Sequence, residues 1–446
     1  MHEAQALGAQ LPLWTLLPFA GMLLAIALLP LAVPHFWERD RNRASVAAAF
    51  ALPVLLYLPA AFGAEGVHVL LEKGAEYVSF IALLTSLYVI SGGIHVRGSL
   101  SGTPLLNTVL IGLGALLASW VGTTGASVLL IRPLLRANEP RERKAHIVVF
   151  FIFVVSNCGG LLTPLGDPPL FLGFLKGVPF EWTFLLWREW LLVNGLLLVT
   201  FNLLDQAIFA REEVERPGSQ LEEVQQHQPI GIEGAANVAF LIGVVAVIYA
   251  AGRGLGNGGE PWHFGVQEAL MLALAAGSYV STARSVHERN HFTFAPITEV
   301  AILFAGIFAT MAPALLLLNV HAESFGIREP WQFFWATGFL SSFLDNAPTY
   351  LTFAATACGL DGIALEGRYL AEYLALGERA AATLAAISTG AVFMGANTYI
   401  GNGPNFMVKA IAEQRGVRMP SFFGYMAWSG SVLIPLFVLC TFLFFR

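Results

Sequence analysis

Long apolar runs alternate with short polar connections along almost the whole chain. The runs that fit one crossing of about 20 residues are Leu13–Val33, Val46–Ala61, Tyr77–Ile94, Leu186–Leu204, Ala236–Ala251, Gln267–Ala283, Val300–Leu318 and Phe422–Phe445. A short amphipathic segment, Val67–Lys73, is expected between the second and third runs. The runs are apolar on all sides and show no alternation with a period of two, which indicates helices. The pattern predicts an all-α polytopic membrane protein.

Two further apolar segments carry a polar tip in the middle. The segment Thr103–Arg136 is too long for one crossing, has basic flanks on both sides and contains the polar stretch Gly122–Ser127. A re-entrant hairpin that enters and leaves on the cytoplasmic side explains this pattern, with its tip near Thr123. Trp331–Ala357 has the same form, with a polar tip at Ser341–Thr349. The sequence therefore predicts two re-entrant hairpins.

Two other apolar segments contain residues that interrupt helices. His146–Lys176 is interrupted by Ser156–Pro169, which holds a glycine pair, three prolines and an aspartate. Ala381–Ile411 is interrupted at Gly395–Pro404. Proline removes a backbone donor and clashes with the preceding turn, and glycine weakens a helix. Because unwound backbone at membrane depth is tolerated only inside protein or along a wet cavity, both breaks are expected to face an internal site.

The order of hairpin followed by broken helix occurs twice. A span that begins with a glutamate precedes each copy, at Glu76 and at Glu299, and the tip Ser119–Ser127 aligns with Ser341–Thr349. Placing the basic loops in the cytoplasm gives the two copies opposite orientations. Inverted repeats with paired broken helices are typical of secondary transporters whose site lies at the midplane of the bilayer.

This pattern divides the chain into five segments. We expect N-terminal scaffold spans in 1–75, a first repeat with hairpin and broken helix in 76–205, and a cytoplasmic linker in 206–233. Further scaffold spans are expected in 234–296, and the second, inverted repeat in 297–446.

Composition agrees with a membrane protein. Hydrophobic residues make up 56% of the 446 residues and charged residues only 12%, about half of what soluble domains carry. The net charge of −6 comes without a basic stripe, so no nucleic-acid partner is expected. No basic region precedes the first apolar run, which we interpret as an uncleaved span. The expected location is the cell inner (plasma) membrane, as a multi-pass protein in contact with the lipid bilayer.

The hairpin tips and the breaks supply oxygen ligands in an apolar setting. The candidate ion- or substrate-binding residues are Thr123, Asn157, Thr163, Asp167, Asp345, Asn346, Asn397, Thr398 and Asn402, with Asn405 as a further oxygen donor. Such oxygens suit a small hard cation. Sodium is predicted at Asp167, Asp345, Asn157 and Asn397. A charged aspartate at the bilayer centre costs roughly 2.5–3.5 kcal/mol on insertion scales, which makes it a functional candidate.

A carboxylate that holds a proton when empty and a cation when deprotonated would exchange the two. Sodium and protons are thus the expected transported or coupling ions, and no bound cofactor is expected. Structural alternatives exist: Asp167 before two prolines would make a good helix N-cap, Asp345 could form a turn, and the asparagines could satisfy freed backbone groups. Arg132, in one arm of the first hairpin, could pair with a carboxylate, extend towards the membrane surface or meet an anionic substrate.

The segment His287–His291 matches the HExxH pattern of zinc proteases. That chemistry needs both histidines on one face of a helix, together with a third ligand. Here the pattern lies in a basic loop near Pro296, so we interpret it as a chance match and expect no enzyme activity.

The first break resembles a known family signature. Ser156–Gly160 and Thr163–Pro169 are similar to the SN-x-GG and TP-x-GDPP motifs of the ion transporter superfamily. That superfamily includes NhaD-type sodium/proton antiporters, arsenite permeases, the melanocyte P protein and citrate or dicarboxylate carriers. Asp345–Thr349 resembles the Asp-Asn-x-Pro segment of the NhaD-type branch, and Gly401–Asn405 resembles its partner in the second repeat.

The resemblance runs from about Glu76 to the C-terminus. It implies a scaffold domain and a transport domain, elevator-like motion, a homodimer, and cation binding at Asn157, Asp167, Asp345 and Asn346. The first tip, at Thr123, has neither a carboxylate nor the Ser-Asn-Thr of dicarboxylate carriers. Sodium/proton antiport is therefore the predicted function. The alternatives are cation-coupled transport of citrate or another organic anion, and transport of arsenite.

Overall fold

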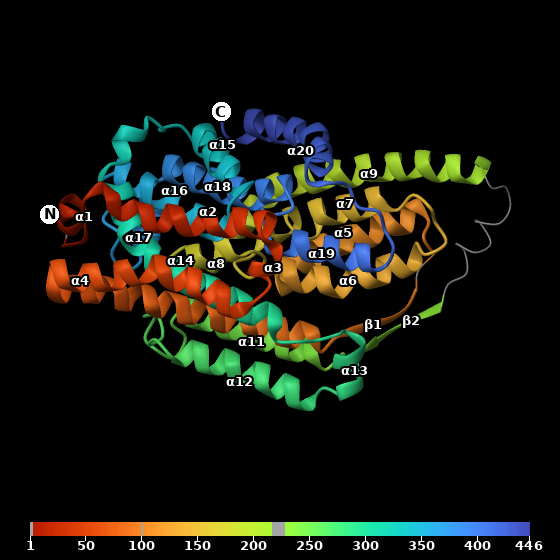
Figure 1. Cartoon of the computed structure of the whole chain (residues 1–446), viewed down its shortest axis with the longest axis horizontal. Coiled ribbons are helices and arrows are strands. Elements are labelled where there is room, and N and C mark those ends of the chain that lie inside the picture. The colour runs from red at the N-terminus through yellow and green to blue at the C-terminus, as the bar shows by residue number, and fades with distance from the viewer. Residues whose placement is uncertain (1–2, 100, 216–227) are drawn as a thin grey trace.

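The computed structural model describes residues 3–99, 101–215 and 228–446. Its helices run roughly along the long axis of an elongated molecule (Figure 1). Within the described part of the chain, eight helical segments are long and apolar enough to cross a membrane. The prediction of an all-α polytopic membrane protein is confirmed.

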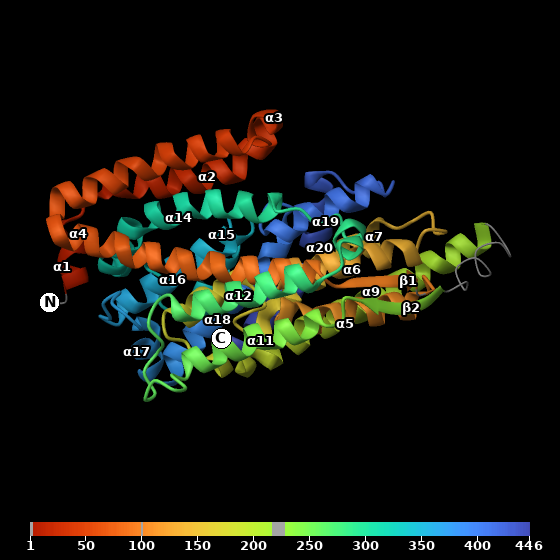
Figure 2. The same ribbon diagram turned by 90° about the horizontal axis from the view of Figure 1, so that it is seen from below.

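The elements of the N-terminal part are α1 (Glu3–Gln10), η1 (Leu13–Leu16), α2 (Leu17–Ala32), α3 (Pro34–Trp37) and α4 (Asp40–Gly92). Helices α2, α3 and the first arm of α4 lie along one side of the molecule, whereas the second arm of α4 runs between α14 (Ala295–Val320) and α12 (Val266–Ser281) (Figure 2). Helix α4 reverses direction at Gly63, whose φ of 56° lies in the left-handed region. A Cβ on Gly66 would lie only 2.1 Å from the carbonyl oxygen of Leu58, so the two arms of α4 meet closely at this turn. The amphipathic segment predicted at 67–73 is not a separate element, because it belongs to the second arm.

The next part contains the first hairpin and the first broken helix. Its elements are β1 (His95–Ser99), α5 (Pro104–Val121), α6 (Thr123–Ala137), α7 (Ala145–Val154), η2 (Cys158–Leu162), α8 (Pro168–Leu175), η3 (Phe180–Leu186) and α9 (Trp187–Glu215). Helices α5 and α6 join at Gly122, whose φ of 80° makes the turn, next to the predicted tip.

The predicted linker 206–233 is more structured than expected where it is described. Helix α9 continues into it through Glu215, and β2 (Gln228–Glu233) forms its end. Strand β2 pairs antiparallel with β1, with Val96 opposite Ile232. Residues 216–227 of the linker lie outside the described residues.

The C-terminal part repeats the order of hairpin, broken helix and long helix. Its elements are α11 (Asn237–Gly252), α12 (Val266–Ser281), α13 (Arg284–Arg289), α14 (Ala295–Val320), η4 (Ala322–Phe325), α15 (Pro330–Ser341), α16 (Asn346–Leu360), α17 (Tyr369–Ala375), α18 (Glu378–Met394), η5 (Gly395–Asn397), α19 (Gly403–Gln414) and α20 (Phe422–Phe444). The short helix α17 was not predicted.

The two hairpins approach the middle of the molecule from opposite ends. The hairpin α5–α6 lies in the half that carries β1 and β2, and α15–α16 lies in the other half (Figures 1 and 2). Helix α19 packs on α6 and α7, while α8 packs on α16 and α18. Each hairpin thus packs against one half of the broken helix from the other repeat. The order of elements agrees with the predicted repeat, whereas the inverted and re-entrant placement in a bilayer stays a prediction.

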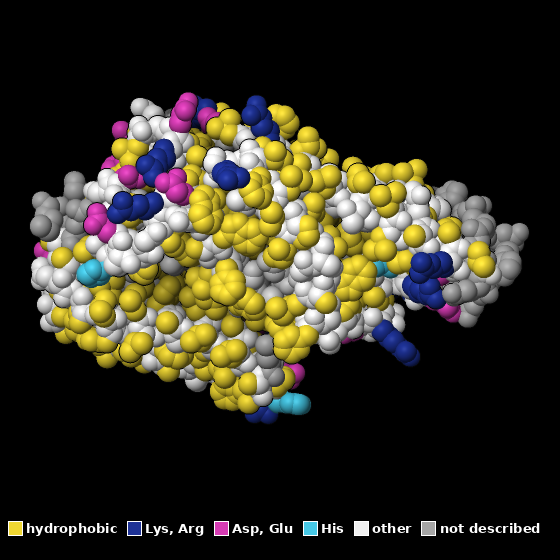
Figure 3. All heavy atoms as spheres, turned by 90° about the horizontal axis from the view of Figure 1, so that it is seen from above, with side chains coloured by type: hydrophobic (Ala, Val, Ile, Leu, Met, Phe, Trp, Pro, Cys, Tyr) yellow, Lys and Arg dark blue, Asp and Glu magenta, His cyan; other side chains and the backbone are white. Residues whose placement is uncertain are grey.

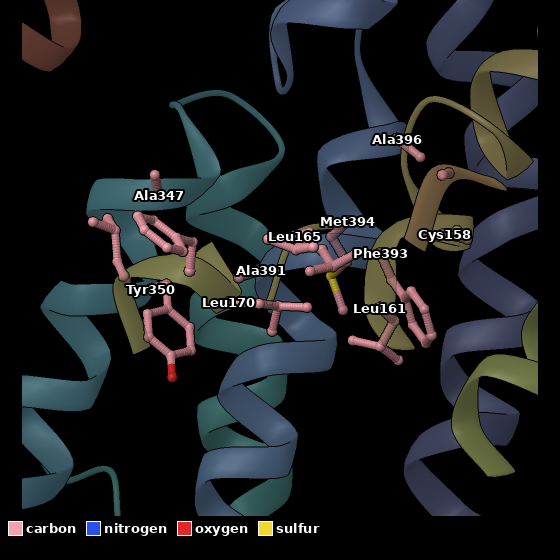
Figure 4. Packing of buried hydrophobic residues seen from close by; sticks show 14 of the residues in the cluster. Cys158, Leu161, Leu165, Leu170, Ala347, Tyr350, Ala391, Phe393, Met394 and Ala396 are labelled. Atoms are coloured by element: carbon pink, nitrogen blue, oxygen red, sulfur yellow. The ribbon is translucent and has the colours of Figure 1, made fainter. Parts of the chain in front are cut away.

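The broken helices form the centre of the fold. Of the apolar window Ala145–Leu162, 89% is buried, compared with 22% for the window in Phe422–Phe444. Leu165, within the first break, and Leu170, directly after it, lie among residues of α16 and α18 such as Tyr350 and Met394 (Figure 4). The face shown in Figure 3 is broadly hydrophobic across its middle, and its charged side chains lie towards the periphery. This distribution suits a molecule surrounded by lipid.

A buried charge network holds the base of the first hairpin. The Arg141 guanidinium contacts Asp205 through Nη1 at 2.5 Å and Glu212 through Nε at 3.1 Å, and the Arg141 side chain is 0% exposed. His146 Nε2 lies 2.8 Å from the same Asp205 oxygen, and Asn107 donates to the other oxygen at 3.1 Å. The network joins α5, α7 and α9 at one end of the molecule.

Candidate functional site

Asp167 lies at the first break, directly before α8. Pro168 and Pro169 suit the first turn of a helix because that turn needs no N–H from them, and Asp167 itself is extended, with φ −145° and ψ 143°. Asp167 is the N-cap residue of α8, as the sequence indicates, but its carboxylate makes no capping bond to the helix. The side chain points into the protein instead, where the residue is 1% exposed.

Three polar side chains from distant elements surround the Asp167 carboxylate. The Thr123 hydroxyl donates to Oδ1 at 3.0 Å, and Asn402 Nδ2 lies 3.4 Å from the same oxygen. Asn346 Nδ2 donates to Oδ2. Thr123 belongs to the first hairpin tip, Asn346 to the second, and Asn402 to the second break. Both hairpin tips and both breaks therefore meet at this carboxylate.

An amide network connects the two breaks directly. Asn402 Nδ2 also lies 3.2 Å from Asn157 Oδ1 and 3.2 Å from the carbonyl oxygen of Ser156. Asn157 Nδ2 donates to Asn405 Oδ1 at 2.7 Å and to the Ile152 carbonyl oxygen at 2.8 Å. Asn157 thus joins the Asp167 cluster through Asn402, and its amide also satisfies freed backbone.

Thr163 and Thr398 hold the breaks against the hairpins. The Thr163 hydroxyl donates to the Ser119 carbonyl oxygen and accepts the Leu165 N–H at 3.1 Å. The Thr398 hydroxyl donates to the Ser342 carbonyl oxygen at 2.5 Å and accepts the Ile400 N–H at 3.3 Å. The same bonding occurs in both copies, so these two hydroxyls position the backbone around the site.

The equivalence of the two hairpin tips is shifted by one residue from the predicted alignment. The alignment placed Thr123 opposite Asp345. In the structure, Thr123 and Asn346 are each the first residue of the returning helix, and both donate to Asp167. The shift arises because sequence similarity at the tips is weak, while the starts of the helices define the register.

Asp345 caps the second returning helix. Its Oδ1 accepts the Ala347 N–H at 3.0 Å, so Asp345 is the N-cap of α16 and not a simple turn residue. Its carboxylate also lies within electrostatic range of Asp167. Asp345 is therefore a capping residue placed next to the central carboxylate.

Asn397 lies in the second break but bonds to the second hairpin. Its Nδ2 donates to the Ser342 hydroxyl at 2.9 Å, and its backbone oxygen accepts the Ser429 hydroxyl at 2.7 Å. Its Oδ1 is buried without a hydrogen-bond partner. This oxygen is free to accept a ligand, although no contact with Asp167 is seen.

Other polar residues extend this network. Asn405, expected as a further oxygen donor, donates to the carbonyl oxygens of Gly395 and Thr398, at 2.8 and 2.9 Å, besides accepting from Asn157. The Ser127 and Ser156 hydroxyls lie 2.8 Å apart. All of them stand in or beside the named motifs, but bonds between residues 248 positions apart are not visible in the sequence.

An open cavity reaches the site between the first hairpin tip and two long helices. It is lined by Gly122–Gly125 and Pro164–Pro168 on one side, and by residues of α4 and α14 such as Leu87, Tyr88 and Val300 on the other. Asp167 and Thr123 are both among its lining residues, and none of the lining residues is basic. The cavity therefore gives access to an anionic, oxygen-rich site.

The two breaks depend on glycines packed against backbone. A Cβ on Gly166 would lie 2.0 Å from the Gly160 carbonyl oxygen, and one on Gly401 would lie 2.6 Å from the Gly395 carbonyl oxygen. Both pairs have the same spacing, and both close the unwound segment on itself. A side chain at either position would push the break apart.

Gly166→Ala is expected to lower stability by about 1–3 kcal/mol or more, because the obstructing atom is backbone and cannot rotate away. The matched control is Gly195→Ala in α9, where a Cβ meets nothing within 4 Å. The control should gain up to about 1 kcal/mol from helix propensity. Thermal unfolding in detergent compares the two variants, and equal melting temperatures would contradict the packing argument.

The HExxH match does not form a metal site. Helix α13 ends at Arg289, and His291 follows with a φ of 48°, so the two histidines do not share a helix face. The His287 ring packs against Tyr279 and Phe292. Among the described residues, no group of three or more His, Cys, Asp or Glu side chains could hold a metal ion.

Comparison with known proteins identifies a family for this chain. No curated protein matches the chain. A sequence family described as putative citrate transport matches residues 8–445, which is nearly the whole chain. The chain, a multi-pass helical protein with two broken helices around a buried carboxylate, belongs to this family of secondary transporters.

Proposed function

We propose that this transporter exchanges sodium for protons at Asp167. The observation that carries the proposal is the Asp167 carboxylate itself, which is buried and surrounded by amides and a hydroxyl from both hairpin tips and the second break. A carboxylate with neutral oxygen-bearing neighbours and no basic partner suits a small cation.

The asparagines can serve both states of the carboxylate. Asn346 and Asn402 present N–H groups to Asp167 in this structure. Rotation of either amide by half a turn would present its oxygen instead, since each amide carries both a donor end and an acceptor end. A sodium ion would then receive one carboxylate and several amide oxygens. A proton on Asp167 would remove the charge that attracts the ion, so the two occupants exclude each other.

We further propose that the hairpins and breaks move together as a transport domain. The cavity at Asp167 separates the first hairpin tip and the first break from α4 and α14, which makes this boundary the natural sliding surface. The division into scaffold segments 1–75 and 234–296 and repeats 76–205 and 297–446 is part of the same proposal. The homodimer and the inner-membrane location stay predictions.

A second candidate is cation-coupled transport of citrate or a related organic anion. The family match favours it, because the family is described by citrate transport. In this case the Asp167 cluster would bind the coupling ion, and the anion would bind next to it. Arsenite remains the weakest alternative, since no observation on the described residues favours it.

Purified protein in sealed vesicles separates the two candidates. For an antiporter, sodium added outside acidified vesicles should restore the fluorescence of a pH-sensitive dye without citrate. For a citrate carrier, radiolabelled citrate should accumulate only with a cation or proton gradient. Citrate uptake without sodium-driven proton movement would overturn the first proposal and support the second.

Asp345→Asn is expected to reduce sodium-driven proton movement strongly while the protein stays folded. Asparagine caps helices about as well as aspartate, so the bond to the Ala347 N–H can persist while the charge next to Asp167 is lost. The dye assay in vesicles measures this variant beside the wild type. Unchanged exchange would limit Asp345 to its capping role.

A further inference from the structure

Three arginines on α6 and α19 lie close to one another and have no acidic partner among the described residues. Arg132 and Arg136 lie on α6, and Arg415 is the C-terminal cap of α19, which packs on α6. Each lies within electrostatic range of the other two. Among the described residues, no carboxylate forms an ion pair with any of them. Arg132 Nη1 and Arg136 Nε are buried and have no hydrogen-bond partner.

Two of the three arginines have a structural explanation. Arg136 lies in the last turn of α6 and donates through Nη2 to the Val96 carbonyl oxygen at 2.6 Å, which ties the hairpin to β1. Arg415 caps the C-terminus of α19. Positive charges at helix C-termini are stabilised by the helix dipole. Neither account applies to Arg132, which lies a full turn further inside α6.

The position of Arg132 connects the arginines with the transport site. Arg132 follows Thr123 by nine residues on the same helix, which places it about 13 Å from the hairpin tip. It is an electrostatic neighbour of Tyr88, and Tyr88 lines the cavity that reaches Asp167. Arg415 is exposed, whereas Arg132 is half-buried. The cluster thus includes the exposed Arg415 and the half-buried Arg132, which is near Tyr88 of the cavity.

A half-buried cluster of like charges requires a counter-ion. Guanidinium groups bind carboxylate and phosphate oxygens through paired N–H groups, and a ligand with several anionic oxygens can engage more than one of them. We propose that Arg132, Arg136 and Arg415 form a binding site for a multivalent oxyanion on α6 and α19, near Tyr88 of the transport cavity. A free di- or tricarboxylate and the phosphate of an anionic lipid share this chemistry. The site is independent of sodium/proton exchange at Asp167.

The test uses the full-length protein in nanodiscs. In neutral phosphatidylcholine, citrate binding is measured by titration calorimetry for the wild type and for Arg132→Gln, which keeps hydrogen bonding but loses the charge and the fork. We expect affinity to fall at least about tenfold, as for loss of a charged hydrogen bond, and Arg132→Lys to be intermediate. Arg284→Gln is the matched control, because Arg284 is 93% exposed and paired with Glu288. It should bind citrate as the wild type does.

A second arm identifies the source of the anion. Nanodiscs containing phosphatidylglycerol should raise the melting temperature of the wild type but not of Arg132→Gln if a lipid headgroup occupies the site, even when citrate does not bind. Equal behaviour of Arg132→Gln and the wild type in both arms would overturn the proposal. If Arg132→Gln does not fold, Arg415→Gln, changed at an exposed position, carries the same comparison.

The vesicle assay distinguishes a failure of this proposal from a failure of the proposed sodium/proton exchange. Arg132→Gln should retain sodium-driven proton movement, because Arg132 makes no contact with the Asp167 cluster. Absence of such movement in the wild type would overturn sodium/proton exchange and leave the arginine site standing. Loss of anion binding with exchange retained would locate the defect at the arginines alone.

Discussion

Asp167→Asn is expected to abolish sodium-driven proton movement while leaving the transporter folded. The substitution removes the buried charge to which all three surrounding side chains donate hydrogen bonds. Truncating one partner of a buried, hydrogen-bonded charge pair costs about 2–5 kcal/mol, which corresponds to a loss of roughly 30-fold to several thousand-fold in cation affinity. Asparagine also cannot carry the exchanged proton, so both halves of the cycle should fail.

The second break explains why this variant should fold. Asn402 occupies the position there that Asp167 occupies in the first break, with nearly the same backbone angles, φ −152° and ψ 141°. An asparagine is therefore compatible with an extended residue before a proline-containing helix start. The new amide N–H would face the donor of Asn346, but rotation of the Asn346 amide relieves that conflict.

The measurement is sodium-dependent recovery of dye fluorescence in vesicles, with the melting temperature as a check on folding. Asp361→Asn is a suitable control, since it removes an aspartate from the end of α16 remote from the tip. Exchange in Asp167→Asn at the wild-type rate, with normal folding, would show that the cation site lies elsewhere. Loss of exchange in the Asp361→Asn control would show that the assay responds to any loss of charge.

Arg141→Ala is expected to destabilise the protein by about 3–5 kcal/mol, as when one partner of a buried ion pair is removed. The substitution leaves Asp205 and Glu212 buried with side chains 0% and 1% exposed and without their shared cation. His146 and Asn107 still contact Asp205, which limits the loss for that carboxylate. The base of the first hairpin should loosen from α7 and α9, lowering the melting temperature before any effect on the ion site.

The matched control for this prediction is Arg284→Ala. Its ion pair with Glu288 has side chains 93% and 65% exposed, and exposed pairs contribute at most about 1 kcal/mol. Thermal unfolding of both variants in the same detergent gives the comparison. If Arg141→Ala and Arg284→Ala have the same melting temperature, the buried network does not stabilise the hairpin.

Most of the fold was predictable because its signals are local. Apolar runs of membrane length, glycines and prolines inside them, and basic loops between them each depend on neighbouring residues alone. The tip at Thr123 and the breaks at Ser156–Pro169 and Gly395–Pro404 were found in this way. The merging of 67–73 into α4 and the pairing of β1 with β2 were missed. The first depends on close packing at a turn, and the second on hydrogen bonds between strands more than a hundred residues apart.

The site was predictable in its residue types but not in its bonding. The sequence by itself determined that Asp167 sits in an unwound segment inside a long apolar run, because no stable helix accommodates Gly159–Gly160 and Pro164 through Pro169. Only the tertiary structure decided that Thr123, Asn346 and Asn402 donate hydrogen bonds to its carboxylate. It also decided that Thr163 and Thr398 bond to backbone carbonyl groups, and that Asn397 bonds to Ser342. The reason is physical: a buried polar group must find a partner, and which partner is near depends on how the two hairpins meet at the centre.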